Sequence, residues 1–317
     1  MNKLLKFNSD GKFKILIFAD VQDQLPVHAR VIEIMKTAIE REKPDLVVFL
    51  GDQTEMSIKD PETDFRDTLE VILAPVVDAG LPYAFVFGNH DDQSYYIGTR
   101  TDKSAMLKVY QSIGDCRTLS VDPTVFGVGN CKIPILSSKG DKTAFDLFMI
   151  DSNTYIYPEN DGGGYDNPHR DQLEWLIKNV DKGVNSLIFQ HIPMPEIYNL
   201  ILENEKGEKF YGGKSYALAL NENAAGYIGE FPCPPEYENN TGEFAAIKEA
   251  GGIIGVLTGH DHLNDFEGVY DGIKMTSVPG LTYFNYGDEA VRGYGVLELY
   301  ENDLSYYKYK TVKISNC

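Results

Sequence analysis

Five short apolar segments each end in an aspartate, asparagine or histidine, and this repeated placement constrains the fold more than any other feature. The segments read ILIFAD, LVVFLGD, AFVFGNHDD, LIFQH and IIGVLTGHDH. Runs of four to eight residues rich in Val, Ile and Phe are typical of strands that are covered on both faces. In open α/β sheets, ligands bind beyond the carboxyl ends of such strands. The pattern therefore predicts a sheet whose strand ends bring polar side chains to a ligand site.

Helical and strand-like patterns alternate along the chain. Apolar residues recur at helical spacing over residues 27–42 and 65–79, and Asn167 followed by Pro168 predicts the start of another helix. The last third turns to strand-like alternation. We therefore expect an α/β fold in which a two-sheet β-sandwich is flanked by helices. The predicted strands cover residues 13–19, 46–50, 83–87, 147–150, 186–189, 253–257, 293–300 and 304–312.

Composition is that of a globular protein and limits the partners. The chain has 317 residues, 43% of them hydrophobic, and no repeat or linker, so we expect a single domain over residues 1–317. Residues 193–243 are rich in Gly, Asn, Glu and Tyr, so we expect a long loop over one rim of the fold. This loop is a candidate for shaping the substrate entrance. The net charge is −19, which repels phosphate backbones and anionic lipids. We therefore expect no nucleic-acid partner and no membrane.

The cysteines and the amino-terminal sequence bear on location. Cys116, Cys131, Cys233 and Cys317 form no CxxC pair, so we expect free thiols and a cytoplasmic protein, with a Cys116–Cys131 disulfide as the alternative. The start of the chain lacks the apolar run of a signal peptide, and no apolar stretch is long enough to span a bilayer. The sequence makes no prediction of oligomeric state.

The residue types at the strand ends indicate a metal centre. Carboxylate, amide and imidazole donors without thiolates are typical of sites for Mn, Fe, Zn or Mg. Each motif alone has an ordinary explanation as a turn or a core histidine, but four of the six histidines lie in these motifs. A carboxylate such as Asp52 can bridge two ions about 3.5–4 Å apart, which clamp a phosphoryl group and activate a bridging water. The candidate ligands are Asp20, Gln22, Asp52, Asn89, His191, His260 and His262.

The order of these motifs resembles the calcineurin-like metallophosphoesterase superfamily, over about residues 13–300. FQHIPMPE and GHDHLNDFEG are similar to a subgroup of small purple-acid-phosphatase-like proteins of fungi and plants. The resemblance implies a four-layer α/β/β/α fold and two divalent or trivalent ions bridged by Asp52. It assigns Asp20, Asp52 and His262 to the first ion, and Asp52, Asn89, His191 and His260 to the second.

The resemblance also implies roles beyond the metal ligands. His90 would lie beside the substrate phosphate with Asn89 and act as the general acid, oriented by Asp91. Arg292 would add a guanidinium to the phosphate, although a plain surface arginine explains it equally well. Tyr283, Phe284 and Tyr286 follow the last motif closely enough to line the pocket; these three are a separate expectation from sequence proximity.

Two positions depart from the family pattern. Gln22 stands where the family usually has histidine, and an amide oxygen is a weaker, harder ligand than imidazole. The first site is therefore expected to be weaker or to favour Mn, Mg or Fe over Zn. Glu55 stands where purple acid phosphatases place a metal-binding tyrosine, so no purple charge-transfer colour is expected.

These observations predict a metal-dependent phosphohydrolase. The main interpretation is a phosphomonoesterase that uses a metal-bridging hydroxide as nucleophile on a phosphate-ester substrate. A phosphodiesterase acting on a nucleotide or lipid headgroup is the alternative, because the same metal core serves both reactions. A metal-binding scaffold that has lost catalysis is a third interpretation, for which Gln22 is the only motif evidence.

Overall fold

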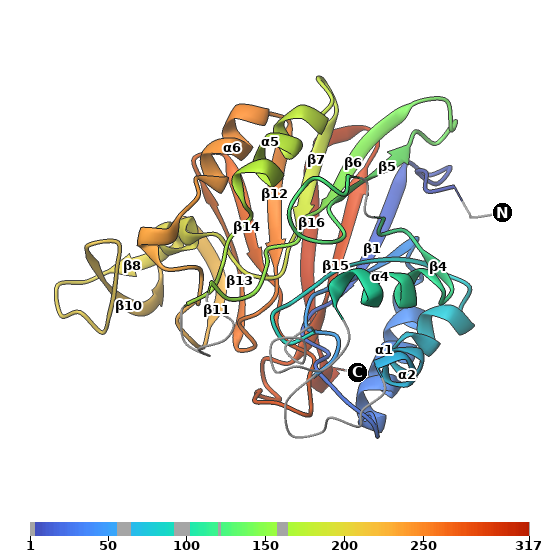
Figure 1. Ribbon diagram of the computed structural model, residues 1–317, viewed down its shortest axis with the longest axis horizontal. Helices are drawn as coiled ribbons and strands as arrows, with labels where there is room; N and C mark the ends of the chain where they lie inside the picture. The colour runs from blue at the N-terminus through green and yellow to red at the C-terminus, as the bar shows by residue number, and fades with distance from the viewer. Residues whose placement is uncertain (1–3, 56–64, 92–101, 120–121, 157–163, 317) are drawn as a thin grey trace.

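Two β-sheets lie face to face at the centre of the computed structural model, which describes residues 4–55, 65–91, 102–119, 122–156 and 164–316 (Figure 1). The first sheet has six strands in the order β16-β15-β1-β2-β3-β4, and the neighbours from β1 to β4 run parallel. These strands are β1 (Lys12–Phe18), β2 (Leu46–Leu50), β3 (Pro82–Val86), β4 (Asp115–Cys116), β15 (Gly293–Tyr300) and β16 (Asp303–Lys313).

The second sheet has seven strands in the order β11-β13-β14-β12-β7-β6-β5. Its central strands β14, β12, β7 and β6 run parallel, and antiparallel strands close both sides. The strands are β5 (Cys131–Leu136), β6 (Thr143–Met149), β7 (Asn185–Phe189), β11 (Ala224–Ile228), β12 (Ile253–Thr258), β13 (Asn264–Tyr270) and β14 (Ile273–Ser277).

Helices cover the outer face of each sheet, which gives four layers (Figure 1). The helices α1 (Ala29–Glu42), α2 (Phe65–Asp78) and α4 (Lys103–Gln111) pack on the first sheet. The helices α5 (Arg170–Asn179) and α6 (Glu243–Ala250) pack on the second. A third apolar cluster fills the space between the sheets, where Ile17 and Leu50 meet Leu147 and Phe189. The predicted sandwich flanked by helices is thus confirmed.

Local chemistry explains where the helices begin. The buried residues of α1 recur at helical spacing and face the first sheet. The helix that the sequence predicts to begin at Asn167 and Pro168 is α5, which begins slightly later, at Arg170. Gln172 accepts a hydrogen bond from the backbone of His169, whereas Asn167 donates its side-chain amide to the Asn239 carbonyl.

The stretch 193–243 contains more regular structure than a rim loop. It begins with the 3₁₀ helix η2 (Pro195–Leu200) and forms a small sheet in the order β8-β10-β9, which projects from the sandwich (Figure 1). It then supplies β11 to the edge of the second sheet and ends in a short 3₁₀ turn, η3 (Tyr237–Asn239). The small-sheet strands are β8 (Ile201–Glu203), β9 (Lys209–Tyr211) and β10 (Lys214–Leu220), and a last 3₁₀ turn, η4, spans Ile314–Asn316.

The cysteines and the helices bear on two further expectations. Cys116, Cys131 and Cys233 are free thiols, so the alternative disulfide is absent; Cys317 lies outside the described residues. Within the described ranges, every helix is too short or too polar to cross a membrane.

Candidate metal centre

The carboxyl ends of five parallel strands, three from the first sheet and two from the second, meet at one edge of the sandwich. Asp20, Asp52 and Asn89 follow β1, β2 and β3, and His191 and His260 follow β7 and β12. All five side chains are buried. The predicted convergence of the strand ends is therefore present in the fold.

The chain bends sharply at these positions. Seven described residues other than glycine have positive φ, and Asp20, Gln22, Asp52 and His260 are four of them. Such backbone strain concentrates at functional sites. Glycines allow the close approach: a Cβ on Gly51 would lie 2.2 Å from His191 Nδ1, and one on Gly88 would lie 2.1 Å from Asp52 Oδ1.

Asp52, His191 and His260 form the tightest group of potential ligands, with one donor atom from each within 4.8 Å of the others. His191 Nε2 lies 3.2 Å from Asp52 Oδ2 and 3.2 Å from Asn89 Oδ1. His191 Nδ1 donates to the Leu50 carbonyl, so in the neutral ring Nε2 carries a lone pair. A lone pair that faces two oxygen acceptors requires a proton or a metal ion between them.

The second group repeats this arrangement around Asp20. His262 Nε2 lies 3.4 Å from Asp20 Oδ1, and His262 Nδ1 donates to the Tyr286 carbonyl. Metal-binding histidines usually donate their other ring N–H to a backbone carbonyl or carboxylate in this manner. The backbone of His260 donates to both carboxylate oxygens of Asp20, at 3.2 and 3.0 Å.

Gln22 supplies the clearest sign that a cation fits here. Its side chain is fully buried, its Nε2 donates to Glu55 Oε2 at 2.8 Å, and its Oε1 has no hydrogen-bond partner among the described residues. A buried acceptor without a donor costs about 1–3 kcal/mol. A hard metal ion would satisfy this oxygen, so the residues present fit a metal ion.

The electrostatics of the metal-free site also favour a bound cation. Burial opposes charge on His191, but Asp52 and Asp20 outweigh it and raise the pKa of His191 to about 10. Burial would also raise the pKa of Asp52, yet His191 and His90 hold it well below its usual range. Burial and the neighbouring His191 lower the pKa of His260. The carboxylates thus attract positive charge into the site.

His90 lies at the pocket, but Asp91 is placed differently from expectation. The half-buried His90 ring lies at the pocket, with Nδ1 3.3 Å from Glu55 Oε1, so Glu55 takes the place expected for Asp91. Burial lowers the pKa of His90, but Asp52 and Glu55 together raise it to about 9. The Asp91 carboxylate instead accepts hydrogen bonds from Gly88, Gln53 and Thr54, which ties the loops after β2 and β3 together.

Arg292 is also placed differently from expectation. It is buried, donates to the Thr282 carbonyl and to Glu289, and lies over the Tyr283 ring. It is not among the described residues that line the pocket. Its observed contacts brace the loop that brings the Tyr286 carbonyl to His262.

Three tyrosines surround the ligands, and the sequence pointed to only one. Tyr286 stacks on His262 as expected from its position, with ring centroids 4.3 Å apart. Asn89 Nδ2 donates to the Tyr155 hydroxyl at 2.9 Å, which turns Asn89 Oδ1 toward His191. Tyr165 packs edge-on against His260. Tyr155 and Tyr165 lie outside the strand-end motifs, and neither was among the residues expected to line the pocket.

A pocket of about 90 Å³ opens over this group. From the projecting segment 193–243, Cys233 reaches its wall, so that segment contributes to the entrance. The lining residues are Gln22, Asp52, His90, Tyr165, Cys233, His260, Asp261, His262 and Tyr286.

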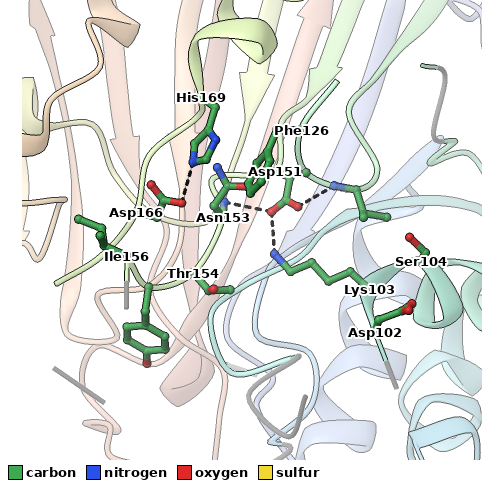
Figure 2. A pocket seen from close by; sticks show the side chains of 13 residues that line it. Asp102, Lys103, Ser104, Phe126, Asp151, Asn153, Thr154, Ile156, Asp166 and His169 are labelled. Atoms are coloured by element: carbon green, nitrogen blue, oxygen red, sulfur yellow. Dashed lines mark hydrogen bonds and ion pairs between the residues drawn. The ribbon is translucent and has the colours of Figure 1, made fainter. Parts of the chain in front are cut away.

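A larger cavity of about 590 Å³ lies nearby and is lined by Tyr155, whose ring stacks on Tyr165. Figure 2 shows hydrogen bonds that join Asp151 to Lys103 and Asn153, and Asp166 to His169. Asp151 accepts from Lys103 at 2.9 Å and from the backbone of Asn153 at 3.0 Å. Asp166 bonds His169 at 2.9 Å.

Comparison with known proteins agrees with this geometry. Residues 13–264 match the calcineurin-like phosphoesterase family. This chain belongs to that family. Among solved structures, a dimetal phosphatase from Danio rerio superposes with a TM-score of 0.55 at 14% identity, covering 91% of this chain and 93% of the other, which shows the shared fold.

Some relatives of this calcineurin-like phosphoesterase are named probable inactive purple acid phosphatases, and another is named a phosphatase. A protein of Arabidopsis thaliana named probable inactive purple acid phosphatase 14 is 26% identical over 89% of this chain and 74% of its own length. The phosphatase DCR2 of Saccharomyces cerevisiae is 29% identical over 89% of this chain. The chain spans 49% of the length of that yeast phosphatase. The resemblance to purple-acid-phosphatase-like proteins is therefore confirmed.

Proposed function

We propose that this calcineurin-like phosphoesterase is a two-metal phosphohydrolase that acts on phosphate monoesters. The observation that supports this most directly is a buried group of carboxylate, amide and imidazole side chains that converge at the strand ends. Gln22 Oε1 has no hydrogen-bond donor among the described residues, and the Nε2 atoms of His191 and His262 each face a carboxylate oxygen.

The two ions would share Asp52. Asp20, Gln22, Asp52 and His262 would hold the first ion, and Asp52, Asn89, His191 and His260 the second. When bound, the ions would supply positive charge for the phosphoryl oxygens and an activated water. Oxygen donors dominate the first site, so Mn, Mg or Fe suit it better than Zn.

The protein's own part in the reaction centres on His90. Glu55 is an acceptor next to His90 Nδ1, so it keeps a proton there and favours the charged ring. Nε2 is then the nitrogen that can give a proton to the leaving oxygen. The backbone N–H of His90 donates to Asp52 Oδ1 at 2.7 Å, which fixes the ring relative to the shared ligand.

The monoester preference rests on the relatives whose names include phosphatase and on the small size of the pocket. A diester would carry a second substituent past Tyr286 or Cys233. The alternative, a phosphodiesterase, uses the same ligands and differs only in how the walls accept that group.

The test is hydrolysis by chelator-stripped protein after separate addition of Mn, Fe, Zn, Mg, Co and Ni. p-Nitrophenyl phosphate and its bis ester are the substrates, and His90→Ala is the control. Metal-restored monoester hydrolysis that falls by about 10²–10⁴-fold in the variant supports the proposal. Faster bis ester hydrolysis favours the phosphodiesterase. Tight binding of two ions with no hydrolysis of either ester favours a scaffold, as the relatives named inactive suggest.

A further inference from the structure

Gln22 and Glu55 are the two positions at which the sequence departs from the family pattern, and their side chains are in direct contact. Gln22 Nε2 donates to Glu55 Oε2 at 2.8 Å, and both side chains are buried, with exposed fractions of 0% and 5%. A contact between two departures suggests that they act as one unit.

The backbone brings this pair together. The loop after β1 runs beside the loop after β2, with a parallel bridge between Asp23 and Thr54. Gln22 N donates to the Asp52 carbonyl at 2.7 Å, and Glu55 N donates to the Asp23 carbonyl at 2.9 Å. The spacing of the two side chains is therefore set by the loops.

The direction of the amide follows from the chemistry of its partner. A glutamine amide has an oxygen acceptor and a nitrogen donor of nearly the same shape, so its surroundings decide which end faces the metal site. The Glu55 carboxylate oxygen accepts a hydrogen bond here, so it pairs with the nitrogen end of the amide. Gln22 Oε1 is consequently left on the other side, buried and without a donor.

We propose that Glu55 is a positioning residue for the first metal site, acting through Gln22. It holds the amide with its oxygen available to the ion, as outer partners of ligands generally do. Because Glu55 also lies 3.3 Å from His90 Nδ1, one carboxylate links a metal ligand to the proposed general acid. The inference rests on the two-metal function proposed above.

The experiment is calorimetric titration of chelator-stripped protein with Mn²⁺, which needs no hydrolysis. Wild type is expected to bind two ions. Glu55→Leu should weaken one binding step by about 10–100-fold and leave the other within about threefold. Glu55→Gln, which retains an acceptor oxygen for Gln22, should recover most of the loss. In a Gln22→Leu background, Glu55→Leu should cause no further loss of Mn²⁺ affinity.

An exchange of the two side chains tests the same inference without the leucine variant, in case that variant misfolds. Gln22→Glu alone sets two carboxylates against each other and should weaken Mn²⁺ binding, although a carboxylate is the stronger ligand. Adding Glu55→Gln recreates the hydrogen bond with donor and acceptor reversed and should restore binding.

Several outcomes would overturn the inference. Unchanged binding by Glu55→Leu, equal weakening of both steps, full additivity with Gln22→Leu, or no rescue in the exchanged pair would each do so. If wild type fails to bind two ions, the two-metal function itself is wrong, which is a different result from a silent Glu55→Leu.

Discussion

The two pockets near Tyr155 and Tyr165 differ in chemistry as well as in size. The metal pocket encloses about 90 Å³ and the cavity of Figure 2 about 590 Å³. In the larger cavity, Asp151 and Asp166 accept hydrogen bonds or ion pairs from neighbouring groups. In the smaller pocket, Gln22 Oε1 lacks a donor and His262 Nε2 faces a carboxylate.

This contrast shows that the pairing of polar groups distinguishes these two pockets better than their volume does. A folded chain normally pairs its buried polar groups, because leaving one unpaired costs free energy. An unpaired acceptor such as Gln22 Oε1 is tolerated when a ligand completes it. On this basis we expect the metal pocket to bind cations, whereas the charged groups of the larger cavity pair with one another.

The largest effect is expected from the shared ligand of the metal pocket. Asp52→Asn removes a charge between two metal positions, so we expect loss of at least one bound ion and a fall in kcat on the order of a thousandfold. Metal content and p-nitrophenyl phosphate hydrolysis measure this. Asp303→Asn, an exposed matched change, should alter neither. An Asp52→Asn protein with two ions and near-normal kcat would contradict the assignment of metal binding to the smaller pocket.

An aspartate-to-asparagine substitution in the larger cavity should instead lower the stability of the protein. Asp151 is buried beside Lys103 Nζ, so Asp151→Asn removes the charge that compensates a largely buried ammonium. We expect the free energy of unfolding to fall by about 3 kcal/mol, with kcat of the folded protein within about twofold of wild type. Urea denaturation and hydrolysis measure the two quantities. A thousandfold loss of kcat at unchanged stability would make this cavity catalytic.

A third buried carboxyl, Glu243 in α6, lies outside both pockets. Gln190 donates to it at 3.4 Å, and burial raises the pKa of Glu243 to about 8. The folded state therefore binds a proton that the unfolded state releases above about pH 4.5. This contribution to stability is present at low pH and is lost as the pH rises toward 8.

Glu243→Gln should remove that pH dependence. Relative to wild type, the variant should gain about 2 kcal/mol of unfolding free energy at pH 9 and change little at pH 5. Urea titrations at both pH values measure this. An equal effect of the substitution at the two pH values would show that Glu243 stays charged in the folded protein.

Much of the fold and most of the ligand positions could be predicted from the sequence. Buried parallel strands leave a local signature, and Asp20, Asp52 and His191 each follow such a strand directly. The partners of these ligands leave no such signature. Glu55 meets Gln22 and His90 only because two loops run side by side, and Tyr155 meets Asn89 from a distant loop.

The misplaced expectations have the same origin. Asp91 and His90 are adjacent in sequence, but the Asp91 carboxylate turns toward the backbone of Gly88 and Thr54. Arg292 lies in a segment that resembles the family, yet its guanidinium binds the Thr282 carbonyl. Sequence proximity does not determine the direction of a side chain, which depends on packing from other parts of the chain.

The smallest expected effect comes from removing one of two matched aromatic rings, one at the larger cavity and one at the metal pocket. Phe126 and Tyr286 are each 49% exposed and each stacks on a histidine, His169 in the larger cavity and His262 in the metal pocket. Phe126→Ala should cost about 1 kcal/mol of stability and change KM for p-nitrophenyl phosphate by less than about twofold.

Tyr286→Ala removes a ring of equal exposure from the wall of the metal pocket, so KM should rise several-fold at similar stability. Steady-state kinetics and thermal unfolding of the two variants make the measurement. A rise in KM confined to Phe126→Ala would mean that the larger cavity receives the substrate. The volume of that cavity, rather than the unpaired Gln22 oxygen of the smaller pocket, would then indicate where the leaving group binds.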